Sequence, residues 1–146
     1  MPSVRGCNLP DELLYDVENN IWYRENPDGT VTLGMTAVAA AMAGQLVAFT
    51  AKKAGRKVEG GKSCATVESG KWVGPAKIAF SAEVVEVNDT LVGNPKIANA
   101  EPYGEGWMVK VKPADWAAAK AGLTPGSAVA GPYEAKMTAD NFAGCE

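Results

Sequence analysis

The sequence predicts a mainly β fold, in which many short strands form a sandwich or flattened barrel and short helices are attached. β-prone runs recur along the chain and are separated by turn-forming proline, glycine, asparagine and aspartate residues. The segments that favour helix are short and rich in alanine. A chain of 146 residues has the size of one ordinary domain. We therefore expect residues 1–146 to form a single domain with short N- and C-terminal extensions.

A first hairpin is predicted around the sequence Asn-Pro-Asp-Gly at residues 26–29. Proline followed by Asp-Gly is typical of a tight turn, and β-prone runs flank it at 21–24 and 30–33. The next segment, up to Ala43, is mostly alanine and methionine and predicts a short helix. Thr36 is placed to cap this helix and Gly44 to end it.

A second hairpin is predicted farther along the chain, after a strand at 46–50 and a loop at 54–61. A β-prone run at 63–68 is followed by turn residues and then by an apolar run at 76–80. This pattern places Lys71 near the tip of the hairpin.

The last third of the chain begins with further short elements. Strands are predicted at 83–87 and 107–111, and Pro113 stops the second of them. Residues 115–121 form an alanine-rich segment that predicts a short helix. The tail from Ser127 carries no clear pattern.

Composition excludes several classes of function. The formal net charge is -3, so the chain as a whole lacks the basic character of a nucleic-acid-binding protein. The chain contains no histidine, which removes Ser-His-Asp and Cys-His chemistry and the commonest general base at neutral pH. The three cysteines are not spaced like zinc ligands, so no metal site is predicted. The absence of histidine favours a carrier or binding protein over a hydrolase.

No transmembrane or export segment is recognisable. The longest apolar run, around 35–43, is far shorter than the roughly 20 residues that span a membrane, and the N-terminus lacks a signal-peptide pattern. We therefore expect a soluble, cytoplasmic protein. Cytoplasmic thiols are normally reduced, so Cys7 and Cys145 are expected as free thiols, although they could also meet as a disulfide. Cys64 is expected to be a small buried residue of its strand.

Lys71 is the strongest candidate for a functional residue, because a lysine at a hairpin apex carries its amine on a long, mobile stem. Turn position alone is weak support, since lysine is common in solvated loops. The runs at 66–71 and 81–88, however, resemble the glycine-cleavage H protein, where a Glu-Ser-x-Lys hairpin precedes a Glu-Val-x-x-Val-Asn strand. Residues 14–24 resemble the opening strands of that family, and residues 94–107 its Asn-Pro, Tyr-Gly and Trp signature.

This resemblance implies a lipoyl-type barrel-sandwich hybrid of two small sheets with short helices. It also implies lipoate in amide linkage to Lys71, attached by a lipoylating enzyme, on a carrier that partner enzymes act upon. Glu68 and Ser69 would then serve recognition by the lipoylating enzyme, or they are simply turn composition. Gly70 is expected to let the turn adopt a conformation that other residues resist.

Several positions depart from the ordinary H-protein pattern. Asn20 and Ile21 stand where a histidine is usual, and Trp72 begins a Trp-Val-Gly-Pro run in place of small and acidic residues. A basic segment, Lys52 to Lys57, replaces an acidic one and is either a solvated loop or an altered docking surface. Trp72 could pack over the dithiolane, contact a partner or rest on its own sheet. Cys7 and Cys145 could act as thiols near the arm.

With these departures, and mainly in its Gly-Lys-Trp-Val-Gly-Pro run at 70–75, the chain resembles the lipoate-binding proteins of sulfur-oxidising prokaryotes. Such a protein would carry a sulfur-containing intermediate or reducing equivalents for a heterodisulfide-reductase-like complex. One alternative is ordinary glycine cleavage, with glycine decarboxylase, aminomethyltransferase and dihydrolipoamide dehydrogenase as partners. Another alternative is an unlipoylated adaptor protein.

Overall fold

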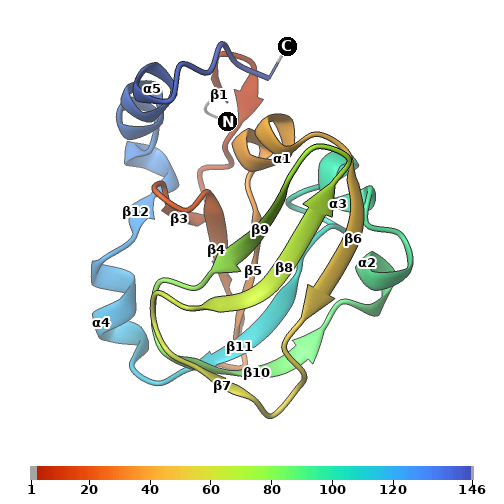
Figure 1. Ribbon diagram of the computed structural model, residues 1–146. Helices are drawn as coiled ribbons and strands as arrows, with labels where there is room; N and C mark the ends of the chain where they lie inside the picture. Colours follow the sequence, from red (N-terminus) through yellow and green to blue (C-terminus); the bar gives the residue numbers. More distant parts are fainter. Residues whose placement is uncertain (1–2, 146) are drawn as a thin grey trace.

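A computed structural model describes residues 3–145 and confirms the mainly β class (Figure 1). Its strands are β1 (Ser3–Val4), β2 (Cys7–Asn8), β3 (Leu14–Asp16), β4 (Ile21–Glu25), β5 (Val31–Met35), β6 (Leu46–Ala51), β7 (Lys57–Val58), β8 (Ser63–Ser69), β9 (Val73–Lys77), β10 (Ala82–Val87), β11 (Val109–Pro113) and β12 (Thr124–Pro125). Its helices are α1 (Ala37–Ala43), α2 (Asp89–Gly93), α3 (Ile97–Ala100), α4 (Trp116–Ala121) and α5 (Ala130–Ala139), with a 3-10 turn η1 (Gly126–Ala128). None of the helices in residues 3–145 is long and apolar enough to cross a bilayer.

Two unequal sheets enclose the main core. The larger sheet has the strand order β12-β3-β4-β5-β11-β10-β7, and the smaller one has the order β6-β8-β9. Apolar side chains from both sheets meet between them, including Leu33 and Val111 of the larger sheet and Cys64 and Val67 of the smaller. Cys64 is fully buried in this core, as the sequence predicts. The smaller sheet presents its other face to solvent and carries the Lys71 hairpin.

The predicted turn chemistry is confirmed around the first hairpin and the first helix. Gly29 takes a φ of +88°, which only glycine adopts readily, and its N–H donates to the Asn26 carbonyl over 3.1 Å to close the turn between β4 and β5. Thr36 Oγ1 accepts from the N–H of Ala39 at 3.2 Å and caps α1. Gly44 ends α1 with a φ of +81° and donates to the Ala40 carbonyl.

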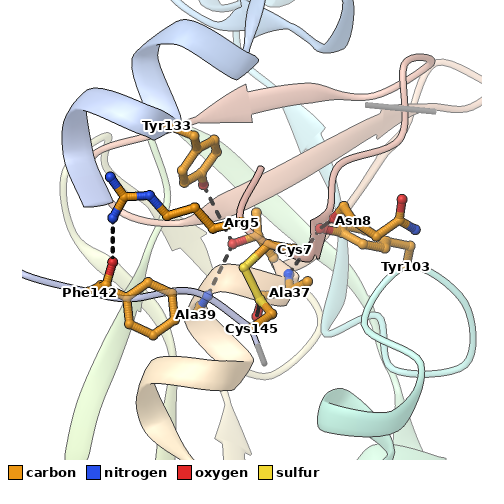
Figure 2. Close-up of a disulfide and its surroundings, with 10 residues drawn as sticks. Arg5, Cys7, Asn8, Ala37, Ala39, Tyr103, Tyr133, Phe142 and Cys145 are labelled. Carbon is orange, nitrogen blue, oxygen red and sulfur yellow. Dashed lines mark hydrogen bonds between the residues drawn. A yellow bond between two sulfur atoms is a disulfide. The ribbon is translucent and has the colours of Figure 1, made fainter. Parts of the chain in front are cut away.

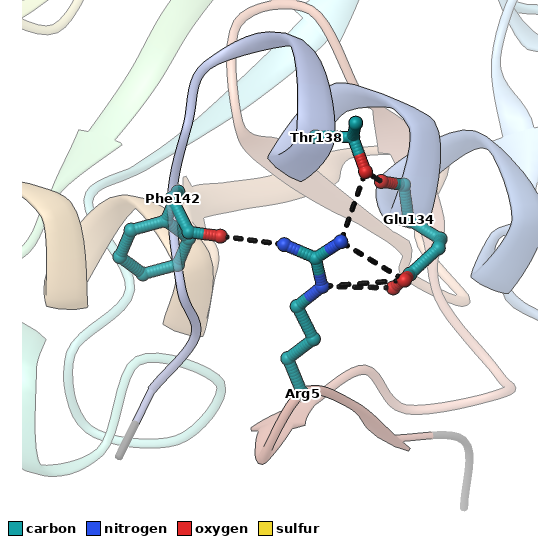
Figure 3. A network of polar contacts seen from close by, with 4 residues as sticks. All are labelled: Arg5, Glu134, Thr138 and Phe142. Carbon is teal, nitrogen blue, oxygen red and sulfur yellow. Dashed lines mark hydrogen bonds and ion pairs between the residues drawn. The ribbon is translucent and has the colours of Figure 1, made fainter.

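The C-terminal tail, whose residues show no clear pattern, forms η1 and α5 and packs on residues near the N-terminus. Tyr133 and Met137 of α5 are buried in a second apolar cluster with Trp22 and residues near the N-terminus. On the exposed side, Arg5 donates to Glu134 at 3.0 Å and to Thr138 at 2.9 Å (Figure 3). The guanidinium of Arg5 also donates to the Phe142 carbonyl at 2.7 Å, and this bond holds the segment that follows α5 against the N-terminal hairpin.

Cys7 and Cys145 form a disulfide in this structure, so the expectation of free thiols is wrong (Figure 2). Their Cα atoms lie 5.0 Å apart, within the usual range for a disulfide. The two cysteines meet because the Arg5 carbonyl accepts from Cys145 N–H at 3.0 Å, which brings the C-terminal segment beside the β1–β2 hairpin. The residues that make these contacts lie at opposite ends of the sequence, and no local sequence pattern predicts such contacts.

Candidate functional site

The hairpin of β8 and β9 carries Lys71 at its tip, as predicted. Glu68 pairs with Val73 in the last rung of the ladder. The turn is closed by the N–H of Ser69, which donates to the Trp72 carbonyl at 2.7 Å. Ser69 Oγ accepts from the Lys71 N–H at 3.3 Å. Ser69 is buried and makes two of the contacts that shape the turn, whereas the Lys71 side chain is exposed.

The prediction for Gly70 is wrong. Its φ lies outside the left-handed region, and a Cβ built on it would have no atom within 4 Å. The Ser69 hydrogen bonds shape the turn without help from a special glycine conformation. An alanine therefore fits at position 70.

The backbone conformation that demands glycine occurs opposite, at Gly44. Gly44 combines φ +81° with ψ -176°, a region essentially restricted to glycine. A Cβ there would lie 3.3 Å from Lys71 Cε, so the lysine stem runs against the bare backbone of the α1–β6 turn. The far end of the Lys71 stem, at Cε, therefore lies against Gly44, while the amine has no hydrogen bond or ion pair with any of residues 3–145.

Asn99 holds the Gly44 turn in place and lies within residues 94–107, the segment that resembles the family signature. Its side-chain N–H groups donate to the carbonyls of Gly44 at 2.8 Å and Ala40 at 3.2 Å. Its Oδ1 accepts from the N–H of Leu46 at 2.9 Å. The side-chain amide of Asn99 thus provides hydrogen-bond partners for backbone groups at the end of α1 and at the start of β6. The side chain acts across more than fifty residues of sequence, which is why local patterns do not reveal it.

A cleft of about 570 Å³ lies beside Lys71 and separates the hairpin from β4 and α1. Its walls are largely apolar and include Ile21, Met35, Met42, Val67 and Met108. Its rim is polar, with Glu18, Asn19 and Asn20 opposite the hairpin. The Oδ1 atom of Asn20 is buried and has no hydrogen-bond partner among the described residues. The cleft therefore has largely apolar walls, and one of its lining residues, Asn20, has a side-chain oxygen without a hydrogen-bond partner in residues 3–145.

Trp72 forms part of the cleft wall and also rests on its own hairpin. Its ring lies over Gly74, where any Cβ would collide with the indole. The side chain remains 44% exposed, next to Val73 at 61%, and Val47, at 59%, lies on β6 across β8 from them. These three side chains and Met42 surround the Lys71 end of the smaller sheet, and we call them the apolar collar. An exposed apolar group of this kind is typical of a contact surface.

Glu68 lies on the solvent-facing side of β8 and does not shape the turn. It stands between Ala48 of β6 and Val73 of β9 in the ladder, and its carboxylate makes no hydrogen bond within residues 3–145. Its position on the outer face beside the collar leaves it accessible to another protein.

The basic segment, Lys52 to Lys57, is exposed but is remote from Lys71. It begins where β6 ends, and Ala51 at that end pairs with Ala65 of β8. Ser69 at the lysine end lies four residues farther along β8, about 13 Å away at the usual rise of a strand. The structure therefore places the basic segment and Lys71 at opposite ends of the smaller sheet.

Cys64 is not a candidate nucleophile. Burial raises the pKa of its thiol to about 12, and its Sγ lies 3.4 Å from the Ala76 carbonyl inside the core. Within the described part of the chain, no cluster of three or more histidine, cysteine or acidic residues could hold a metal ion.

Comparison with known proteins agrees with this geometry. The sequence model of the family described as glycine cleavage H-protein matches residues 13–134. The chain is 53% identical to glycine cleavage system H protein 5 of Aquifex aeolicus strain VF5, over 84% of this chain and 85% of that one. It is 43% identical to a probable glycine cleavage system H protein 2 of Sulfurisphaera tokodaii, over 77% of each chain.

Among solved structures, the fold is similar to a glycine cleavage system H protein from Mycobacterium marinum. The TM-score is 0.74 at 30% sequence identity, and the match covers 88% of this chain and 98% of that one. The chain therefore belongs to the glycine cleavage H-protein family, whose members carry lipoate covalently on a lysine and serve as carriers, not as catalysts.

Proposed function

We propose that Lys71 is the lysine that carries lipoate and that the protein works as a lipoyl carrier with a swinging arm. The observation that carries this proposal is the place of Lys71: an exposed side chain whose amine has no ion pair within residues 3–145, at the tip of a hairpin beside an apolar cleft. The arm supplies a dithiol that can be oxidised to a disulfide. The protein presents this group, shelters it and docks it to partner enzymes.

The residues around Lys71 fit such a group. Acylation converts the amine to an amide, which removes a charge and leaves one N–H donor. Asn20 lines the cleft and its buried Oδ1 has no hydrogen-bond partner within residues 3–145, so this side chain would have to turn towards the cleft to accept from the amide N–H. The apolar walls, with Met35 and Met42, suit an alkyl chain and a sulfur-containing ring.

The lipoylating enzyme has a defined surface to recognise. Ser69 fixes the turn through its two backbone contacts, and Glu68 and the collar lie on the accessible face beside it. Ser69 is thus a positioning residue, and Glu68 a recognition residue. Trp72 serves both the cleft wall and the collar.

Incubation with a purified lipoylating enzyme and activated lipoate tests this assignment. We expect modification of the wild type and of Lys77→Ala, which alters another lysine of the same cleft, and none of Lys71→Arg. Glu68→Ala should slow modification without changing the melting temperature. Equal modification of Lys71→Arg and wild type would contradict the assignment. A wild type that stays unmodified while a proven H protein is lipoylated would favour the adaptor alternative.

For the pathway, we propose that the arm serves dissimilatory sulfur oxidation with a heterodisulfide-reductase-like complex in the cytoplasm. Support comes from the Trp-Val-Gly-Pro run, whose tryptophan borders both the cleft and the collar, and from the exposed basic segment. Because the basic segment lies at the far end of the sheet, a partner that uses both surfaces must cover the whole length of β6 and β8. Such a partner would need an apolar contact at the arm and an acidic contact about one strand length away.

Glycine cleavage is the second candidate, and the names of the relatives favour it. In that pathway the arm would carry an aminomethyl group from glycine decarboxylase to aminomethyltransferase, and dihydrolipoamide dehydrogenase would reoxidise it. Three of the relatives, named glycine cleavage system H proteins 5, 3 and 2, come from the same Aquifex aeolicus strain. That organism therefore has several H-protein chains, which leaves room for different chains to serve different pathways.

Assays of the lipoylated protein with each enzyme system separate the two pathways. The sulfur-oxidation proposal predicts turnover with the heterodisulfide-reductase-like complex and little turnover with glycine decarboxylase. Reversing charge at Lys52 and Lys53 should weaken binding to that complex, most clearly at low salt, whereas Lys96→Glu on α3 should not. Normal rates with glycine decarboxylase, together with no binding to the complex, would establish the second candidate instead.

A further inference from the structure

The Cys7–Cys145 disulfide lies beside the start of α1 (Figure 2). Cys145 Sγ is 3.6 Å from the carbonyl oxygen of Ala37, at the first residue of α1. Gly44 ends the same helix and contacts the Lys71 stem. Helix α1 therefore connects the disulfide at one end with the lysine at the other.

A hollow follows α1 from Cys145 to Gly44, the residue against which the Lys71 stem lies, although Lys71 itself does not line it. A depression of about 360 Å³ is lined by Ala37, Ala40, Ala41 and Gly44 of α1 and its end, and by Cys145. At 1.5 Å per residue, the seven residue steps from Ala37 to Gly44 cover about 10 Å. A lipoyl chain places about seven bonds between the lysine nitrogen and its nearer sulfur, so at about 1.3 to 1.5 Å per bond it reaches a similar distance.

The two cysteines differ in exposure. Cys7 is fully buried, whereas Cys145 is partly exposed and forms the end of the hollow. Because Cys145 lines the hollow and Cys7 does not, we expect an incoming thiolate to reach the Cys145 sulfur and not that of Cys7. Thiol–disulfide exchange requires access to one sulfur and a leaving group on the other.

From this geometry, and resting on the proposed lipoylation of Lys71, we propose that the Cys7–Cys145 disulfide is a second redox centre that accepts two electrons from the reduced arm of the same chain. Cys145 Sγ bonds to one arm thiolate as the Cys7–Cys145 bond breaks and Cys7 leaves as a thiolate. The second arm thiol then displaces Cys145 from that bond. The arm ends as a disulfide, and its two protons end on Cys7 and Cys145. The dithiol is oxidised, the cysteine pair is reduced, and no other oxidant is needed.

Differential alkylation of the lipoylated full-length protein tests this exchange. The arm is first reduced with NADH and catalytic dihydrolipoamide dehydrogenase, and free thiols are then labelled and mapped by peptide mass. We expect labels on Cys7 and Cys145 as well as on the arm, and a second equivalent of NADH consumed per chain. The lipoylated Cys7→Ser/Cys145→Ser double variant should consume only one. Cys64 should stay unlabelled in the native protein because of its raised pKa.

A mixing control distinguishes exchange within one chain from exchange between chains. Lys71→Arg protein, which keeps the disulfide, is mixed with the lipoylated double variant, which keeps the arm. We expect slow labelling of Cys7 and Cys145 in this mixture, but fast and concentration-independent labelling in the lipoylated wild type. Labelling at equal rates in both samples would overturn the proposal.

The accessible sulfur is identified by a matched pair of single variants. In lipoylated Cys7→Ser, the remaining Cys145 thiol should form a disulfide with the oxidised arm, seen as a linked pair of peptides. In lipoylated Cys145→Ser, the buried Cys7 should form little of this product. A fully labelled arm with Cys7 and Cys145 unlabelled in the wild type would overturn the exchange alone. A protein whose intact mass shows no lipoyl increment would overturn the exchange together with the lipoylation of Lys71.

Discussion

Asn99 donates a hydrogen bond of 2.8 Å to the carbonyl of Gly44, and this contact links α3 to the turn on which the Lys71 stem rests. Replacing Asn99 with alanine removes this bond and two others, and it leaves the N–H of Leu46 without a partner. We expect Asn99→Ala to lower the free energy of unfolding by about 2 kcal/mol in urea titrations. Asn94→Ala, at an exposed asparagine that makes no side-chain hydrogen bond in residues 3–145, should cost much less. Equal losses would contradict the role given to Asn99.

Gly44 and Gly70 flank the Lys71 side chain and should respond differently to alanine. Gly44→Ala forces a side chain into a glycine-only conformation against Lys71 Cε, at a cost of about 1 to 3 kcal/mol. Gly70→Ala meets no atom and should change the stability by less than about 0.5 kcal/mol. Thermal unfolding of the two variants checks both values. A strongly destabilised Gly70→Ala would show that the turn needs glycine after all.

The terminal disulfide should contribute strongly to stability because it closes a loop with a sequence separation of 138 residues. Loops of this size are associated with a stabilisation of about 2 to 5 kcal/mol. We expect dithiothreitol to lower the melting temperature of the wild type and to leave that of Cys7→Ser/Cys145→Ser unchanged. An unchanged wild type, with reduction verified by alkylation, would contradict this.

Alkaline pH should destabilise the protein. Burial raises the pKa of Cys64 and of Tyr103 to about 12 in the folded state, so the unfolded chain loses these protons first. The stability that depends on the protonated forms is complete below about pH 8.5, the ordinary thiol pKa, and falls as the pH rises towards 12. Urea titrations from pH 8 to 10 should show this decline, and Cys64→Ala should make it shallower. A stability that rises over this interval would contradict the assignment.

The sequence predicted the local features of the site and missed its long-range features. Proline and glycine at 26–29, the cap at Thr36 and the end of α1 at Gly44 are local devices, and the structure confirms each of them. The Cys7–Cys145 bond and the three bonds of Asn99 connect residues far apart in the chain, and no spacing rule reports them.

Two further differences between the sequence predictions and the structure concern Gly70 and the basic segment. Glycine in a turn usually signals a special backbone angle, but at position 70 the N–H of Ser69 closes the turn and its hydroxyl accepts from Lys71, so the usual reason for glycine is absent. The distance between the basic segment and Lys71 depends on the pairing register of β6 with β8, which only the folded sheet reveals.

Peptide mass mapping of the protein isolated from its native host shows whether Lys71 carries the lipoyl group. We expect a lipoyl increment on the peptide that contains Lys71, none on the peptide that contains Lys77, and loss of the increment in a host that expresses Lys71→Ala. An increment on another lysine, or an unmodified protein in a host whose other lipoyl proteins are modified, would contradict this expectation.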